Sequence, residues 1–223
     1  MRKKILCQWL QMVWGLFVFA FGVHLTIYAN IGLAPWDCLG MGIARQTPLN
    51  YGLSMTAMAV VVLLLDILMG EKIGFGTVID ALLTGNFTQL FNTLNPLPEN
   101  QNVFLGAVVM LAGLSIMAYG QYLHMRAAQG CGPRDALLVG LGKRLPRLPI
   151  GAVEVLLLGF AVLSGWLLGG PVGIGTVIST FGTGIVMQLV YNAVHFEPRD
   201  VRHRGLLEVT RILLGHEQTA SLK

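Results

Sequence analysis

Residues 32–48 read GLAPWDCLGMGIARQTP, and residues 130–146 read GCGPRDALLVGLGKRLP. Both stretches carry Gly, Pro, Asp, Leu, Gly and Pro in the same order and at the same spacing. As a helix, the roughly 14 residues between the two prolines of each stretch measure about 20 Å, against about 30 Å for the hydrocarbon core of a bilayer. Each stretch is therefore predicted to be a short helix that enters a membrane without crossing it.

Composition places the chain in the membrane class. Of its 223 residues, 54% are hydrophobic and only 12% are charged, and the mean hydropathy is +0.67. A single soluble core of this size cannot hide so much apolar surface. The chain is therefore predicted to be an all-α polytopic membrane protein.

Six segments are long and apolar enough to cross a bilayer as helices. They are residues 5–28, 52–69, 75–91, 103–125, 150–168 and 172–196. The third is the least apolar, so it should be the best shielded from lipid. An alternative with eight crossings, in which the two short stretches also span, is disfavoured because these stretches are too short.

The charge distribution indicates the side of the membrane on which each loop lies. With a cytoplasmic N-terminus and six crossings, Arg45 is the only one of the 15 Lys and Arg residues outside, as the positive-inside rule requires. The C-terminus is then also cytoplasmic. The net charge of +4 follows from this topology and does not indicate nucleic-acid binding, because the basic residues form no aromatic-interleaved patch.

An internal duplication covers most of the chain. In both halves the short stretch is followed by a helix, a Gly-x-Gly-Thr turn and another helix, and GFGTVI at 74–79 matches GIGTVI at 173–178. The sequence predicts a first membrane repeat at residues 1–98, with an external linker from about residue 93, and a second at residues 99–196. Three crossings per repeat, an odd number, make the second repeat inverted relative to the first, as in many channels and secondary transporters.

Residues 197–223 form a charged tail beyond the second repeat. Within it, residues 201–214 place Leu and Val among Arg and Glu, which is typical of an amphipathic helix on the cytoplasmic face of a membrane. A partly disordered basic tail is the alternative interpretation.

The two Pro-x-Asp motifs allow a structural and a functional interpretation. Pro35 and Pro133 suit the first position of a helix, because proline lacks the N–H that would remain unpaired there. Asp37 and Asp135 fall in the first turn, where a carboxylate balances the positive end of the helix dipole. An ionisable group at membrane depth is also a candidate site, so the two Asp residues could together bind a cation or a proton.

One difference between the two motifs suggests a specific site. Arg134 in the second half stands where the first half has Trp36. We expect Arg134 to pair with an Asp or to meet an anionic group of a substrate, while Trp36 supplies an apolar wall.

The Gly-x-Gly-Thr turns are candidate hinges or capped turns. Thr77 and Thr176 can cap the helices that follow, and Thr77 has capping-box spacing to Asp80. The glycines permit close approach of backbones. These glycines are Gly74, Gly76, Gly173 and Gly175. A packed, capped turn is favoured over a phosphate-binding loop, since no Walker-type Lys follows.

Polar side chains on the third and sixth predicted spans are further candidates. They are Asn86, Gln89, Thr183 and Gln188. Two interpretations remain open: hydrogen bonds that hold helices together, or the lining of a solute path.

The sequence offers little for catalysis or metal binding. Cys7, Cys38 and Cys131 show no CxxC spacing, so neither a disulfide framework nor a metal site is predicted. There is no HExxH motif, no nucleophile-base pair and no cluster of carboxylates along the sequence, so an intramembrane enzyme is disfavoured. No cofactor is expected.

The GLAPWD motif at 32–37, the GFGT turn at 74–77 and their counterparts in the second half resemble the YczE/YyaS/YitT-type bacterial integral membrane proteins. The likeness covers most of residues 8–195. Because that family is largely uncharacterised, the resemblance implies a multi-pass protein of the bacterial inner membrane and no particular substrate.

Together these features favour a transporter or channel for an unknown small solute, with H⁺ or a cation as the coupling ion. Its central site is expected at Asp37, Arg134 and Asp135. The alternative from another class is a membrane scaffold or accessory protein whose Pro-x-Asp segments are only structural. The lipid bilayer is the expected partner in both cases.

Overall fold

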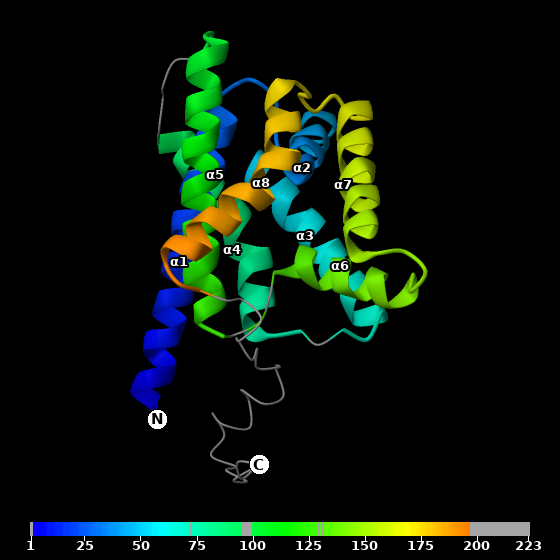
Figure 1. Ribbon diagram of the computed structural model, residues 1–223. Helices are drawn as coiled ribbons and strands as arrows, with labels where there is room; N and C mark the ends of the chain where they lie inside the picture. The colour runs from blue at the N-terminus through cyan, green and yellow to red at the C-terminus, as the bar shows by residue number, and fades with distance from the viewer. Residues whose placement is uncertain (1, 72, 95–99, 129, 131, 197–223) are drawn as a thin grey trace.

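The computed structural model describes residues 2–71, 73–94, 100–128, 130 and 132–196. These residues form eight α-helices and no strand (Figure 1). The helices are α1 (Arg2–Tyr28), α2 (Pro35–Gln46), α3 (Tyr51–Leu68), α4 (Phe75–Leu94), α5 (Val103–Arg126), α6 (Pro133–Arg144), α7 (Ile150–Leu167) and α8 (Ile174–Ala193). The predicted tail helix at 201–214 lies outside the described residues, as does much of the linker.

The all-α prediction is confirmed, and the helices begin and end close to the predicted bounds. Four of them, α1, α3, α5 and α8, are long and apolar enough to cross a membrane, in agreement with a multi-pass membrane protein. The described part of α7 is a shorter apolar helix, and α4, the span expected to be least apolar, is not among the four. The two Pro-x-Asp helices, α2 and α6, have 12 residues each.

Two glycine pairs hold α1 against α5. A Cβ at Gly15 would lie 2.9 Å from the carbonyl oxygen of Gly120, and one at Gly22 would lie 2.7 Å from that of Gly113. Such distances mean that the two backbones touch. Because the contacts run in opposite directions along the two helices, α1 and α5 are antiparallel.

The remaining helices pack in pairs that correspond between the two halves. In the first half α4 packs on α1, and in the second α8 packs on α5. The short helix α2 packs on α7 of the other half, and α6 packs on α3. Figure 1 shows the result as two groups, with α1, α4, α5 and α8 on one side and α2, α3, α6 and α7 on the other.

Several helix starts follow from local sequence. Asn50 accepts a hydrogen bond from the N–H of Leu53 and so caps α3 (2.8 Å). Asn102 does the same for α5, accepting from Phe104 at 2.9 Å. Side-chain oxygens of this kind satisfy amides that have no partner within the helix.

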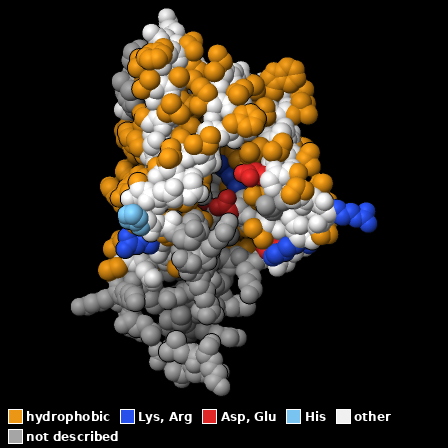
Figure 2. Space-filling model, in the orientation of Figure 1, with side chains coloured by type: hydrophobic (Ala, Val, Ile, Leu, Met, Phe, Trp, Pro, Cys, Tyr) orange, Lys and Arg blue, Asp and Glu red, His pale blue; other side chains and the backbone are white. Residues whose placement is uncertain are grey.

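The outer surface is rich in large apolar side chains, as a lipid-facing protein requires. Figure 2 shows hydrophobic side chains spread over most of one face. Phe104, Phe160 and Phe181 are among the most exposed of them. A soluble protein of this size would rarely expose so much contiguous apolar surface.

Candidate functional site

Each short helix is preceded by a glycine that docks on the Gly-x-Gly-Thr turn of the other half. Gly32 has a φ of 113°, and a Cβ there would lie 2.5 Å from the backbone nitrogen of Gly173. Gly130 has a φ of 129°, and its Cβ would lie 2.8 Å from Oγ1 of Thr77. Both the positive φ and the lack of space require glycine at these positions.

The Gly-x-Gly-Thr turns are packed, capped turns. Thr77 Oγ1 accepts from the N–H of Gly74, and Thr176 Oγ1 accepts from that of Gly173, both at 3.2 Å. The N–H of Gly175 donates to the carbonyl of Ile31 at 2.7 Å. These amides are therefore occupied by the protein itself, which argues against a phosphate-binding loop.

The capping register expected for Thr77 and Asp80 is wrong. The helix begins at Phe75, so Thr77 lies inside its first turn and its hydroxyl reaches back to Gly74. The Asp80 carboxylate instead accepts a hydrogen bond from Thr84, one turn further along α4. Asp80 therefore does not act as a capping residue of α4.

The far ends of the short helices are also tied to the other half. On α2, Gln46 donates to the carbonyl of Leu168 at the end of α7 (3.1 Å). On α6, Arg144 donates to the carbonyl of Met69 at the end of α3 (3.1 Å). Gln46 and Arg144 are counterparts in the duplication, as are Leu168 and Met69. α2 is thus bonded to α7, and α6 to α3, at corresponding positions.

Asp37 lies inside the protein, and its side chain does not cap the amides of α2. Its exposed fraction is 3%, and its Oδ1 accepts a hydrogen bond from the hydroxyl of Tyr51 on α3 (3.1 Å). The positive charge within electrostatic range of this carboxylate is Arg134, from the first turn of α6. A residue of the second half thus helps to balance a buried carboxylate of the first.

Arg134 joins the two short helices. Its guanidinium carbon lies 5.4 Å from the ring centroid of Trp36, in the first turn of α2. A cation over an indole face at this distance is attracted by the ring, by about 0.5–2 kcal/mol depending on how far it is desolvated. Trp36 is therefore more than an apolar wall, because it holds Arg134 in place.

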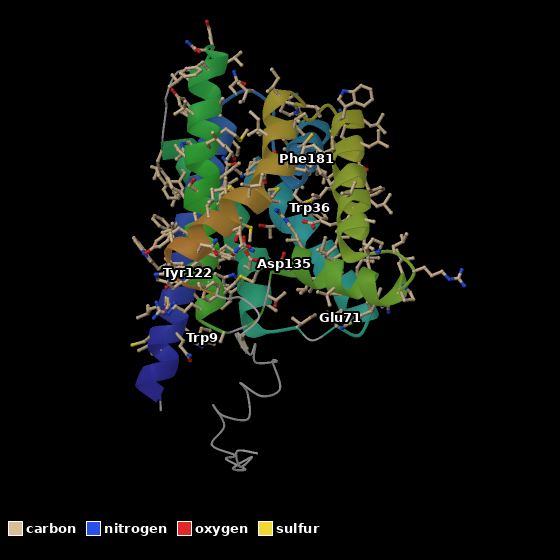
Figure 3. All side chains as sticks on the ribbon, in the orientation of Figure 1. Trp9, Trp36, Glu71, Tyr122, Asp135 and Phe181 are labelled. Carbon is tan, nitrogen blue, oxygen red and sulfur yellow. The ribbon has the colours of Figure 1, made fainter. Side chains whose placement is uncertain are left out.

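Asp135 lies close to other acidic residues. Its charged neighbours are Asp80 on α4, Arg134 beside it and Glu154 on α7. A Cβ at Gly132 would lie 2.8 Å from Oδ2 of Asp80 and 3.6 Å from Oδ2 of Asp135, so both carboxylates border the same glycine. Figure 3 shows Trp36 and Asp135 in the central part of the molecule, and Figure 2 shows acidic and basic side chains gathered at a hollow near the middle of the face.

Asp37 and Asp135 do not form the direct pair that the duplication suggested. In the described part of the chain no hydrogen bond joins them, and each has Arg134 as a basic neighbour. The physical reason is that Asp37 is turned to Tyr51 on α3, while Asp135 borders Asp80. Arg134 lies within range of both.

The polar side chains of α4 and α8 make different kinds of hydrogen bond in the two halves. Gln89 accepts from the N–H of Gly52 on α3 (3.3 Å), and Asn86 donates to the hydroxyl of Thr56 on α3 (3.2 Å). In the second half the polar side chains of α8 form hydrogen bonds within their own helix. There Gln188 donates to Asn192 at 2.8 Å, and Thr183 donates to the carbonyl of Ser179 at 2.5 Å.

Three polar groups of the interior were not singled out as site residues by the sequence. Tyr51 is the hydroxyl donor to Asp37. Asp66 on α3 is fully buried, and neither carboxylate oxygen has a hydrogen-bond partner. His124 on α5 is 5% exposed with its Nε2 unpaired. The sequence could have pointed to Asp66, because its counterpart in the duplication is Gly165. This is the same kind of difference between the halves that pointed to Arg134.

A metal centre is not formed by these groups. In the residues that the structure describes, no set of three or more His, Cys, Asp or Glu side chains is placed to hold a metal ion.

Comparison with known proteins supports the membrane class. The chain is 30% identical over 183 residues to an uncharacterised protein of Haemophilus influenzae, covering 82% of this chain and 83% of that protein. It is 25% identical over 194 residues to the uncharacterised membrane protein YczE of Bacillus subtilis, covering 84% and 87% of the two chains. The uncharacterised protein YyaS of the same organism is 24% identical over 196 residues, covering 84% and 95%.

The resemblance to the YczE and YyaS proteins drawn from the motifs is thus confirmed. No solved structure matches the chain. A family model of unknown function matches residues 6–192, nearly all of the described fold. The chain belongs to this family, DUF6198.

Proposed function

We propose that this protein is a transporter or channel for a small solute in the bacterial inner membrane, with its central site at the first turns of α2 and α6. The observation that carries the proposal is the contact of Arg134 with Trp36 beside the buried carboxylate of Asp37. Ionisable groups at membrane depth are costly, so they are expected to mark a solute or ion path.

The arrangement of the two halves supports an inverted repeat. The counterpart helices α1 and α5 are antiparallel, and the short helices α2 and α6 are bonded to the opposite half at corresponding positions. In the proposed topology both termini are cytoplasmic, α2 enters from outside and α6 from the cytoplasm. Such half-helices meeting near the midplane form the substrate sites of many secondary transporters.

The charge of the central group favours a cationic solute, or H⁺ or a cation as coupling ion. Arg134 is a charged neighbour of both Asp37 and Asp135, and Asp80 and Glu154 are further acidic neighbours of Asp135. Carboxylates thus outnumber the one guanidinium in this group, and an excess of negative charge raises the local concentration of cations.

The experiment is a ligand-stabilisation screen on purified protein, followed by uptake of the stabilising compounds in proteoliposomes. A solute that binds the folded state raises the unfolding temperature. The variants Asp37→Asn, Asp135→Asn and Arg134→Gln should lose most of the uptake and the stabilisation by solute. Glu71→Gln is the matched control, since Glu71 pairs with Lys143 and is not among the charged neighbours of Asp37 or Asp135.

The scaffold alternative makes the opposite prediction. If Asp37→Asn and Asp135→Asn lower the unfolding temperature but leave uptake at the level of Glu71→Gln, the two carboxylates are structural. If no compound stabilises the protein or is taken up, a scaffold or accessory role replaces transport.

A further inference from the structure

The seam between α3 and α4 in the first half is closed. A Cβ at Gly85 would lie 2.7 Å from the carbonyl oxygen of Gly52, and one at Gly52 would lie 2.9 Å from that of Gly85. Beside this backbone contact the side chain of Asn86 donates to Thr56 across the seam at 3.2 Å. The two helices therefore touch along glycine and are bridged by polar side chains.

The corresponding seam between α7 and α8 is open. Gly151 and Gly184 are the counterparts of Gly52 and Gly85, and nothing lies within 4 Å of a Cβ built at either. Between the helices lies a groove of about 580 Å³. Its lining includes Val155, Gly159 and Trp166 of α7 and Val177, Thr180 and Phe181 of α8.

This seam is the main packing difference between the halves. The pairs α1–α4 and α5–α8 correspond, as do α2–α7 and α6–α3, and as do α2–α3 and α6–α7. Among the described helices, α3–α4 is the packed pair whose counterpart, α7–α8, is not packed.

The two seams suggest a division of the molecule into two bodies. The helices α2, α3, α6 and α7 pack on one another, and we name them the mobile bundle; α1, α4, α5 and α8 form the frame (Figure 1). The seam α3–α4 docks one side of the mobile bundle on the frame, while at α7–α8 the other side stands away. Between these seams, the glycine contacts of Gly32 with Gly173 and of Gly130 with Thr77 join the bodies in the same way in both halves.

We propose that the mobile bundle rocks on the frame to a second conformation, in which α7 docks on α8 along Gly151 and Gly184 and α3 parts from α4. Each seam carries glycine on both helices at matching places, so each can form a close backbone contact. Closing the groove between α7 and α8 mainly removes apolar surface from contact with its surroundings. The two halves share one plan but pack differently, so the mobile bundle and the frame have two alternative packed arrangements. Rocking between two such arrangements opens a central site first to one side of a membrane and then to the other.

In the proposed topology the closed contact of Gly52 with Gly85 lies in the outer half of the membrane, and Gly151 and Gly184 lie in the cytoplasmic half. The groove itself is lined by Val155 to Trp166 of α7 and by the N-terminal half of α8, so the separation of α7 from α8 is not confined to one half of the membrane. The movement itself does not depend on whether a solute is carried.

The test uses cysteine pairs placed on the two seams, in full-length protein whose Cys7, Cys38 and Cys131 are replaced by Ala. The pair Thr56→Cys and Asn86→Cys marks the closed seam, because these side chains are hydrogen-bonded. Their counterparts are Val155 and Ile185, exposed by 65% and 66%, so replacing them removes no packing. Both pairs should form a disulfide or a short maleimide bridge in proteoliposomes, each in a fraction of the molecules.

A third substitution makes the result specific. Nothing lies within 4 Å of a Cβ at Gly184, so Gly184→Leu should not lower the unfolding temperature. In the second conformation the added side chain would keep α7 and α8 apart, so it should abolish the bridge between positions 155 and 185. A bridge at 56 and 86 in all molecules with none at 155 and 185 overturns the proposal. So does a bridge at 155 and 185 that persists in the Gly184→Leu protein. Bridging requires no solute. If both pairs form bridges but no solute is taken up, only the transport proposal is refuted. If a solute is taken up but the pair at 155 and 185 never bridges, only this movement is refuted.

Discussion

At the scale of single residues, Asp37 shows how a charge is accommodated inside the apolar bundle. Its carboxylate has one hydroxyl donor, Tyr51, and one basic neighbour, Arg134. Removing a partner from a buried polar group leaves the group unsatisfied, which costs more than the bond itself contributes.

Tyr51→Phe should therefore lower the free energy of unfolding by about 1–3 kcal/mol, because the carboxylate of Asp37 loses its donor. Thermal unfolding in detergent measures the effect. In the double variant with Asp37→Ala the loss from Tyr51→Phe should shrink, since the acceptor is gone. Equal losses in both backgrounds would show that the hydrogen bond contributes nothing.

Asp66 presents the opposite case. It is fully buried with no partner for either oxygen, so the protein retains a group that weakens the fold. Asp66→Leu should raise the free energy of unfolding by about 1–3 kcal/mol, the cost of an unsatisfied buried group. Ser54→Ala on the same helix is a control with a smaller expected gain in stability, because the Ser54 hydroxyl is also buried and unpaired but carries no charge. A fall in stability for Asp66→Leu would mean that the carboxyl group has a structural partner.

At the scale of helices, the contact of α1 with α5 depends on glycine. A Cβ at Gly120 would lie 2.4 Å from the backbone nitrogen of Phe19 and 2.8 Å from the carbonyl oxygen of Gly15. Both neighbours are backbone, so neither can rotate away.

Gly120→Ala should destabilise the protein by about 1–3 kcal/mol or more, the usual range for overpacking. Gly159→Ala is the matched control, because nothing lies within 4 Å of its Cβ position. There alanine should stabilise the helix by up to about 1 kcal/mol through its higher helix propensity. Comparable losses at both positions in thermal unfolding would contradict the close contact.

The same scale shows what the sequence could and could not predict. The existence and extent of the helices followed from long apolar runs and from Pro35 and Pro133, since both are local features. The role of Thr77 did not follow, because two start positions for the helix differ by only a few residues and either allows a cap. The duplication drew attention to Arg134, but its position over Trp36 depends on how α2 and α6 approach each other, which no local pattern encodes.

At the scale of the whole molecule, the two short helices should end on opposite sides of the membrane. Arg45 and Lys143 are counterparts near the C-terminal ends of α2 and α6, and both are exposed. With a membrane-impermeant maleimide on intact cells, a cysteine at position 45 should react and one at position 143 should react only after lysis. Labelling of both from the same side would exclude inverted repeats.

The antiparallel contact of α1 with α5 has a consequence for the origin of the chain. Gly15 of one half meets the counterpart of Gly22 in the other, and Gly22 meets the counterpart of Gly15. This is the reciprocal contact found in a twofold homodimer, where one surface patch serves both partners. A half-length ancestor that inserted into the membrane in both orientations would have formed this interface with a second copy of itself.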